Sequence, residues 1–120
     1  MENLLALTKS LTTIPSPTGY TTEIMSFLEE KLGKIGYDTQ QNRKGSLIVT
    51  VPGQNTEQQR FITAHVDTLG AIVRAIKPDG RLKMDLIGGF KYNAIEGEYC
   101  TVHTQAGKEL TGTILMQQTS

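Results

Sequence analysis

A histidine and an aspartate two residues apart, His65 and Asp67, have the types and spacing that suit metal chemistry. An imidazole can coordinate a metal through either ring nitrogen, and residues two apart in a strand point to the same face. A carboxylate beside a metal-bound imidazole accepts its second N–H, which fixes the tautomer and the ring orientation. The spacing is compatible with a metal ligand and its orienting partner, but two such residues this close together often occur by chance. The simpler alternative is a strand-end histidine that bonds to a carboxylate and serves only the fold.

The residues before this pair predict the strand that positions it. Residues 60–65 form an apolar, β-prone run, and Asp67 and Gly70 follow shortly after it. In open α/β sheets, ligands and metals bind outside the carboxyl ends of the strands. We therefore expect the candidate site at the end of a buried strand.

The rest of the chain is predicted to form two helices and then only strands. Leucines at helical spacing predict a helix over residues 3–13, and an apolar face from Ile24 to Ile35 predicts a second, which starts from Thr18-Gly19 and ends at Gly33 or Gly36. Period-two patterns between turn residues predict the strands, which cover residues 37–41, 46–51, 60–65, 71–76, 81–86, 98–104 and 108–116.

This order of elements predicts an α/β fold class with two domains. Residues 1–87 are expected to be the N-terminal part of an α/β/α sheet, and residues 88–120 the beginning of an inserted small β domain. The glycines at 88 and 89 mark the predicted boundary between them.

Composition and charge exclude several classes of function. Twelve Lys and Arg residues balance twelve Asp and Glu residues, so bulk charge attracts neither nucleic acid nor an anionic membrane. No apolar run approaches the roughly 20 residues that span a bilayer. Cys100 is the single cysteine, so no internal disulfide can form, and the first residues lack the basic start of a secretory signal. We expect a cytoplasmic protein with no nucleic-acid or membrane partner.

Other groups with chemical potential are expected to be structural. Cys100 and His103 have metal-like spacing, but residues three apart in a strand face opposite sides. Ser16 and Ser46 have no paired His-Asp arrangement that would favour a nucleophile. The two glycines at 88 and 89 do not match a phosphate-binding loop.

Residues 63–73 resemble the first metal-ligand segment of the co-catalytic zinc aminopeptidases, which include glutamyl, deblocking and tetrahedral aminopeptidases. Further segments resemble this family in the same order, at residues 16–20, 45–47, 87–90 and 102–112. Ser46 replaces the asparagine that is usual in the second of them. The resemblance is collinear over nearly the whole chain.

The resemblance implies an aminopeptidase-type α/β/α sheet and a two-metal site. His65 would be a ligand of one of two divalent ions, zinc or cobalt, and Asp67 would orient it. In the family, the other ligands and the general base lie beyond the inserted β domain. The resemblance therefore implies a peptide substrate and a homo-oligomer for the complete enzyme, whereas residues 1–120 alone are expected to be inactive.

Two alternatives remain open at this point. The chain could be a non-catalytic fragment that self-associates through an exposed sheet edge near residues 98–116. It could also belong to the related deacylases and carboxypeptidases, which share the His-x-Asp-Thr segment at 65–68. Those enzymes usually continue with a proline-containing loop, whereas residues 69–73 run into another predicted strand, which favours the aminopeptidases.

Overall fold

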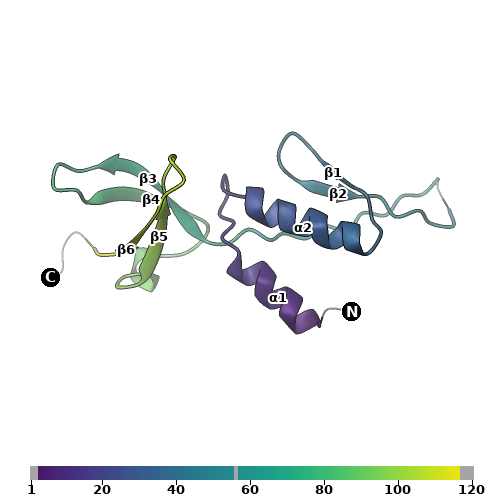
Figure 1. The fold of residues 1–120 in the computed structure, drawn as a ribbon, viewed down its shortest axis with the longest axis horizontal. Helices are drawn as coiled ribbons and strands as arrows, with labels where there is room; N and C mark the ends of the chain where they lie inside the picture. Colours follow the sequence, from purple (N-terminus) through teal and green to yellow (C-terminus); the bar gives the residue numbers. More distant parts are fainter. Residues whose placement is uncertain (1–2, 56, 117–120) are drawn as a thin grey trace. The chain divides into compact units, whose positions relative to one another are not determined.

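A computed structural model describes residues 3–55 and 57–116 of the chain (Figure 1). In chain order its elements are α1 (Leu4–Thr13), α2 (Thr22–Lys34), β1 (Thr39–Gln41), β2 (Leu47–Val49), β3 (Gly70–Ile76), β4 (Leu82–Ile87), the 3-10 helix η1 (Tyr92–Ala94), β5 (Tyr99–His103) and β6 (Glu109–Thr113). The strands pair as three two-stranded antiparallel sheets, β1–β2, β3–β4 and β5–β6. The predicted α/β class, with two helices followed by strands, is confirmed.

The chain divides between Gly88 and Gly89 into two compact units. The first unit holds α1, α2 and the sheets β1–β2 and β3–β4, and the second holds η1 and the β5–β6 hairpin. The assignment of residues 1–87 to a catalytic domain and of residues 88–120 to an inserted β domain stays a prediction.

The two helices begin and end for local reasons. The Asn3 side chain accepts a hydrogen bond from the Leu5 backbone N–H at 3.1 Å, which satisfies one of the free donors at the start of α1. Helix α2 begins at Thr22, later than predicted, because the chain first makes a turn in which the Tyr20 N–H donates to the Pro17 carbonyl at 2.8 Å. It ends at Lys34, just before Gly36.

The strand predicted at residues 60–65 does not form, and this prediction is wrong for the described chain. From residue 59 to residue 69 the backbone has no regular structure. A β-strand is held by backbone hydrogen bonds to a neighbouring strand. Among the described residues, no strand pairs with residues 60–65. The expected burial also fails, since the side chains of Phe61 and Ile62 are 85% and 98% exposed.

The first unit has a very small core. Among the residues that the structure describes, only Ile24 of α2 and Ser16 of the loop before it are buried. Many large apolar side chains stay exposed, including those of Leu69 and Val51. The loop between the helices therefore supplies one of the two residues that are buried in the described chain, and that residue is polar.

The β3–β4 hairpin is closed by a turn whose chemistry is local. The Gly80 N–H donates to the Lys77 carbonyl at 2.9 Å, and Gly80 has φ 82°, a conformation that costs glycine little. The Asp79 carboxylate accepts a hydrogen bond from the Arg81 backbone N–H at 3.0 Å and forms an ion pair with the Arg81 guanidinium at 2.6 Å. Turn residues and charge thus agree with the hairpin that the sequence predicts.

This turn predicts that the folded chain loses a small part of its stability at acidic pH. Hydrogen bonds from the Arg81 side chain and backbone lower the pKa of Asp79 below its ordinary value. A carboxyl group whose pKa is lower in the folded protein than in the unfolded chain stabilises the folded protein at pH values above the unfolded pKa. This stabilisation is lost as the pH falls through the folded pKa. The difference in unfolding temperature between Asp79→Asn and the unmodified chain is therefore expected to shrink below about pH 4. A difference that is constant from neutral pH to acid would contradict this.

Candidate functional site

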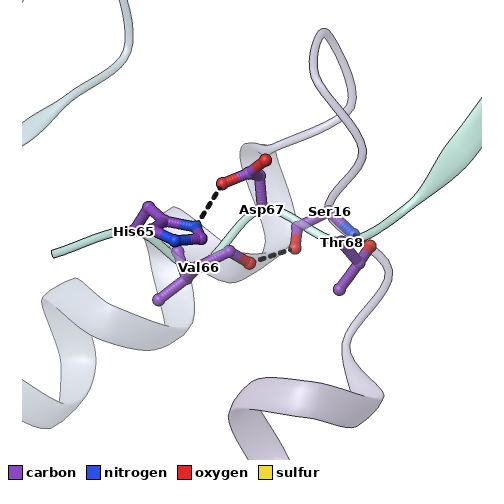
Figure 2. Close-up of polar contacts among 5 residues, drawn as sticks. All are labelled: Ser16, His65, Val66, Asp67 and Thr68. Atoms are coloured by element: carbon purple, nitrogen blue, oxygen red, sulfur yellow. Dashed lines mark hydrogen bonds and ion pairs between the residues drawn. The ribbon is translucent and has the colours of Figure 1, made fainter. Parts of the chain in front are cut away.

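The structure brings His65 and Asp67 into direct contact (Figure 2). The His65 Nδ1 and Asp67 Oδ1 atoms lie 2.7 Å apart. An ionised carboxylate only accepts hydrogen bonds, so the His65 Nδ1–H group must be the hydrogen-bond donor to Asp67. In the neutral imidazole this leaves the lone pair on Nε2, on a side chain that is 87% exposed. The imidazole is therefore in the tautomer and bonding state in which a histidine ligates a metal.

These donors fit one corner of a metal site and no more. A catalytic zinc ion usually takes three protein ligands. Within residues 3–55 and 57–116, no group of three or more His, Cys, Asp or Glu side chains is placed to hold a metal ion. An ion bound at His65 would need additional ligands from outside the described residues.

A hollow of about 300 Å³ lies beside the pair. One side is formed by Thr8, Leu11 and Thr12 of α1, and the other by residues 65–68. Leu11 of α1 thus lines the hollow together with the imidazole. Sequence reasoning placed α1 correctly but did not connect it with His65.

Ser16 is a functional candidate that sequence reasoning considered only as a nucleophile. Its Oγ atom donates a hydrogen bond to the Val66 carbonyl at 2.6 Å (Figure 2). The Ser16 N–H donates to Thr68 Oγ1 at 2.9 Å, and the Thr68 N–H donates back to the Ser16 carbonyl at 3.2 Å. We call these three hydrogen bonds the Ser16 clamp. The sequence holds one signal for this clamp. Pro15 and Pro17 have no backbone N–H, so Ser16 carries the single backbone donor of residues 15–17.

Gly70 lies so close to the same loop that no side chain fits there. A Cβ atom at Gly70 would lie 2.5 Å from Pro17 Cβ and 2.9 Å from Pro17 Cγ. Both are atoms of a rigid ring next to Ser16, so the loop or β3 would have to move. The glycine after the His-Asp segment is thus required by a close approach between two chain segments.

We expect Gly70→Ala to destabilise the first unit by about 1–3 kcal/mol, the usual cost of forcing extra atoms into a packed contact. Gly33→Ala is the matched control, because a Cβ at that exposed helical position meets no atom within 4 Å. Alanine is favoured over glycine in a helix by up to about 1 kcal/mol, so the control is expected to be neutral or stabilising. Chemical denaturation measures both variants. Equal stability of the two would contradict the close approach at Gly70.

The second histidine and the cysteine make separate contacts within the β5–β6 hairpin. His103 Nδ1 lies 3.3 Å from the Glu109 Oε1 atom on the facing strand. Cys100 has a free thiol, and it lies opposite Gly112 in the register of β5 and β6. That both residues are structural stays a prediction.

Neither of the two described α-helices has the length and apolar character that a membrane span requires.

Comparison with known proteins adds an independent line of information. Residues 45–120 match the family described as M42 glutamyl aminopeptidase. YhfE of Bacillus subtilis (strain 168), named as a candidate aminopeptidase, is 58% identical over 120 residues, which is 100% of this chain and 35% of YhfE. The glutamyl aminopeptidase of Lactococcus lactis subsp. cremoris (strain MG1363) is 27% identical over 103 residues, 85% of this chain and 29% of that protein.

A solved structure resembles this fold as well. The structure described as PhTET1-12s, a dodecamer in the asymmetric unit, superposes with a TM-score of 0.78 and 25% identity, over 91% of this chain and 32% of that chain. The chain therefore spans about a third of the length of the proteins that it matches. Since the family match covers more than half of its residues, the chain belongs to the M42 glutamyl aminopeptidase family.

Proposed function

We propose that His65 holds one of two divalent metal ions, zinc or cobalt, in a metal-dependent aminopeptidase, and that Asp67 orients its imidazole. The observation that carries the proposal is the 2.7 Å contact between His65 Nδ1 and Asp67 Oδ1. It places the proton on the nitrogen that faces the carboxylate, and the Nε2 lone pair is then available to a metal ion. Membership in the M42 family supports the choice of a peptide as substrate.

The residues of this chain would contribute binding and orientation to the reaction. His65 would hold one of the ions, and the chemistry that a bound pair would supply is activation of water and polarisation of the scissile carbonyl. Asp67 holds the imidazole ring against rotation, so that its Nε2 lone pair keeps one direction. Leu11 and Val66 give the adjoining hollow apolar lining groups.

The chain is expected to be inactive without further ligands. At the candidate site, its described residues offer one imidazole with an orienting carboxylate, whereas a catalytic zinc needs about three protein ligands. Because the chain spans about a third of its relatives, the remaining ligands are proposed to lie in sequence that corresponds to the other two-thirds.

A chimeric protein gives the sharpest test of this function. Residues 1–120 replace the matching segment of YhfE, to which they are 58% identical, and unmodified YhfE is assayed beside the chimera. We expect both to hydrolyse aminoacyl-nitroanilides, to lose activity with a chelator and to regain it with zinc or cobalt. The 120-residue chain alone is expected to show none. Activity of YhfE without activity of a folded chimera would count against the proposal, as would hydrolysis by residues 1–120 alone.

The proposal extends to assembly and location. We propose a homo-oligomer, which the dodecameric PhTET1-12s structure supports. We also propose a cytoplasmic location, since the single cysteine, Cys100, is a free thiol of the kind that persists in a reducing compartment.

A self-association module is the second candidate, and one observation favours it. The β5–β6 sheet has two strands, so each strand has an outer edge with no partner among the described residues. Tyr99 on β5 is 87% exposed. Unpaired edges readily accept another chain. Analytical ultracentrifugation that finds only monomer at high concentration would remove this candidate without affecting the metal proposal.

A further inference from the structure

The segment that carries His65 and Asp67 has two different faces. Exposed and half-buried residues alternate along it, with His65 and Asp67 exposed and Val66 and Thr68 half-buried. The exposed residues form the imidazole–carboxylate contact, and the half-buried ones bond to Ser16. Each side chain of the proposed metal corner is therefore next to a residue that the clamp holds.

No strand pairing holds this segment in place. The backbone from residue 59 to residue 69 joins no sheet in the described chain. The His65 and Asp67 side chains are 87% and 55% exposed, so little packing restrains them. The direction of the imidazole then depends on the backbone, which the Ser16 clamp fixes on both sides of Asp67.

Ser16 suits this role because its bonding options are restricted. Its side chain is fully buried, and burying a hydroxyl group without a partner is costly. The Val66 carbonyl at 2.6 Å is the partner of that hydroxyl. Pro17 disfavours the helical region for the residue before it, which restricts the Ser16 backbone toward extended conformations.

We propose that Ser16 and Thr68 are positioning residues, which hold the backbone around Asp67 so that the carboxylate keeps the His65 imidazole in the Nδ1–H tautomer. This inference rests on the proposed function, since it assigns a reason for holding a metal ligand. Ser16 acts through the Val66 and Thr68 backbone and not on the substrate. Loss of one clamp bond is expected to weaken metal binding about tenfold, the lower end of the range for groups that orient a ligand.

The experiment compares matched variants of the 120-residue chain. Ser16→Ala removes the hydroxyl donor to Val66, and Thr68→Val removes the acceptor for the Ser16 N–H. Thr68→Ser keeps that acceptor and is the conservative rescue. Ser46→Ala changes an exposed serine outside the clamp and is the control.

The first measurement is the histidine tautomer by ¹⁵N NMR at about pH 9, above the usual titration range of histidine. We expect the Nδ1–H tautomer at His65 in the unmodified chain, in Thr68→Ser and in Ser46→Ala. Ser16→Ala and Thr68→Val are expected to move His65 toward the Nε2–H form, while the hairpin resonances of β5–β6 stay unchanged. If Ser16→Ala does not fold, the comparison of the His65 tautomer between Thr68→Val and Thr68→Ser tests the inference. An unchanged tautomer in folded Thr68→Val would overturn the inference.

The second measurement is the affinity of each variant for Co²⁺, followed at the His65 resonances. About tenfold weaker binding in Ser16→Ala and Thr68→Val, with rescue in Thr68→Ser, supports the clamp. If the unmodified chain binds no Co²⁺ at His65, the same comparison is made in the chimera with YhfE, which supplies the further ligands. A folded chimera that binds no Co²⁺ removes the proposed metal role, and the tautomer measurement still decides whether the clamp exists. Equal Co²⁺ affinity in all variants would overturn the clamp and leave the metal role intact.

Discussion

His65→Ala is expected to abolish metal-dependent hydrolysis by the chimera with YhfE. The substitution removes the Nε2 lone pair that the contact with Asp67 leaves available for an ion. A ligand contributes more than the group that orients it, so the loss in kcat/KM is expected to exceed about 100-fold. The measurement is the rate of aminoacyl-nitroanilide hydrolysis at saturating zinc, together with the zinc content of the purified protein.

His103→Ala is the matched control for this prediction, because it removes the second histidine of the chain. His103 lies in β5, in the second unit, near Glu109. We expect that variant to keep its bound zinc and most of its activity. Loss of zinc in His103→Ala with retention in His65→Ala would reverse the assignment of the ligand.

Asp67→Asn is expected to lower metal affinity and kcat/KM by about 10–100-fold. The amide has nearly the same shape as the carboxylate, but it is neutral, so its oxygen accepts a weaker hydrogen bond from the His65 Nδ1–H group. The fold is expected to survive, since the Asp67 side chain is 55% exposed. Competition with a chelator of known affinity measures the change in binding.

Asp38→Asn controls for the loss of one negative charge, because Asp38 is an exposed aspartate outside the candidate site. We expect its metal affinity to equal that of the unmodified protein. An equal loss in Asp38→Asn and Asp67→Asn would show a general charge effect and would remove the orienting role from Asp67.

Elements that depend on nearby residues were predictable from the sequence. The hairpin β3–β4 was expected from two β-prone runs around Pro78-Asp79-Gly80, and it forms with strands at Gly70–Ile76 and Leu82–Ile87. The turn residues and the ion pair between Asp79 and Arg81 are all within a few positions of one another. The His65–Asp67 contact belongs to the same class, because its residues are two apart.

Features that depend on distant residues could not be predicted. The strand expected at residues 60–65 requires a neighbouring strand, and its apolar pattern carries no information on whether one is present. The Ser16 clamp joins residues 50 and 52 positions apart, which spacing cannot reveal. The close approach of Gly70 to Pro17 is likewise a product of the fold, although the glycine itself was noted.

The most direct measurement is a Co²⁺ titration of the 120-residue chain, followed by paramagnetic broadening of its NMR signals, which detects even a weakly held ion. The proposal predicts broadening that is strongest at the His65 imidazole, extends to Asp67 and Thr68, and disappears in His65→Ala. Broadening centred on His103 and Glu109, or broadening that persists in His65→Ala, would contradict the assignment of His65 as the metal ligand.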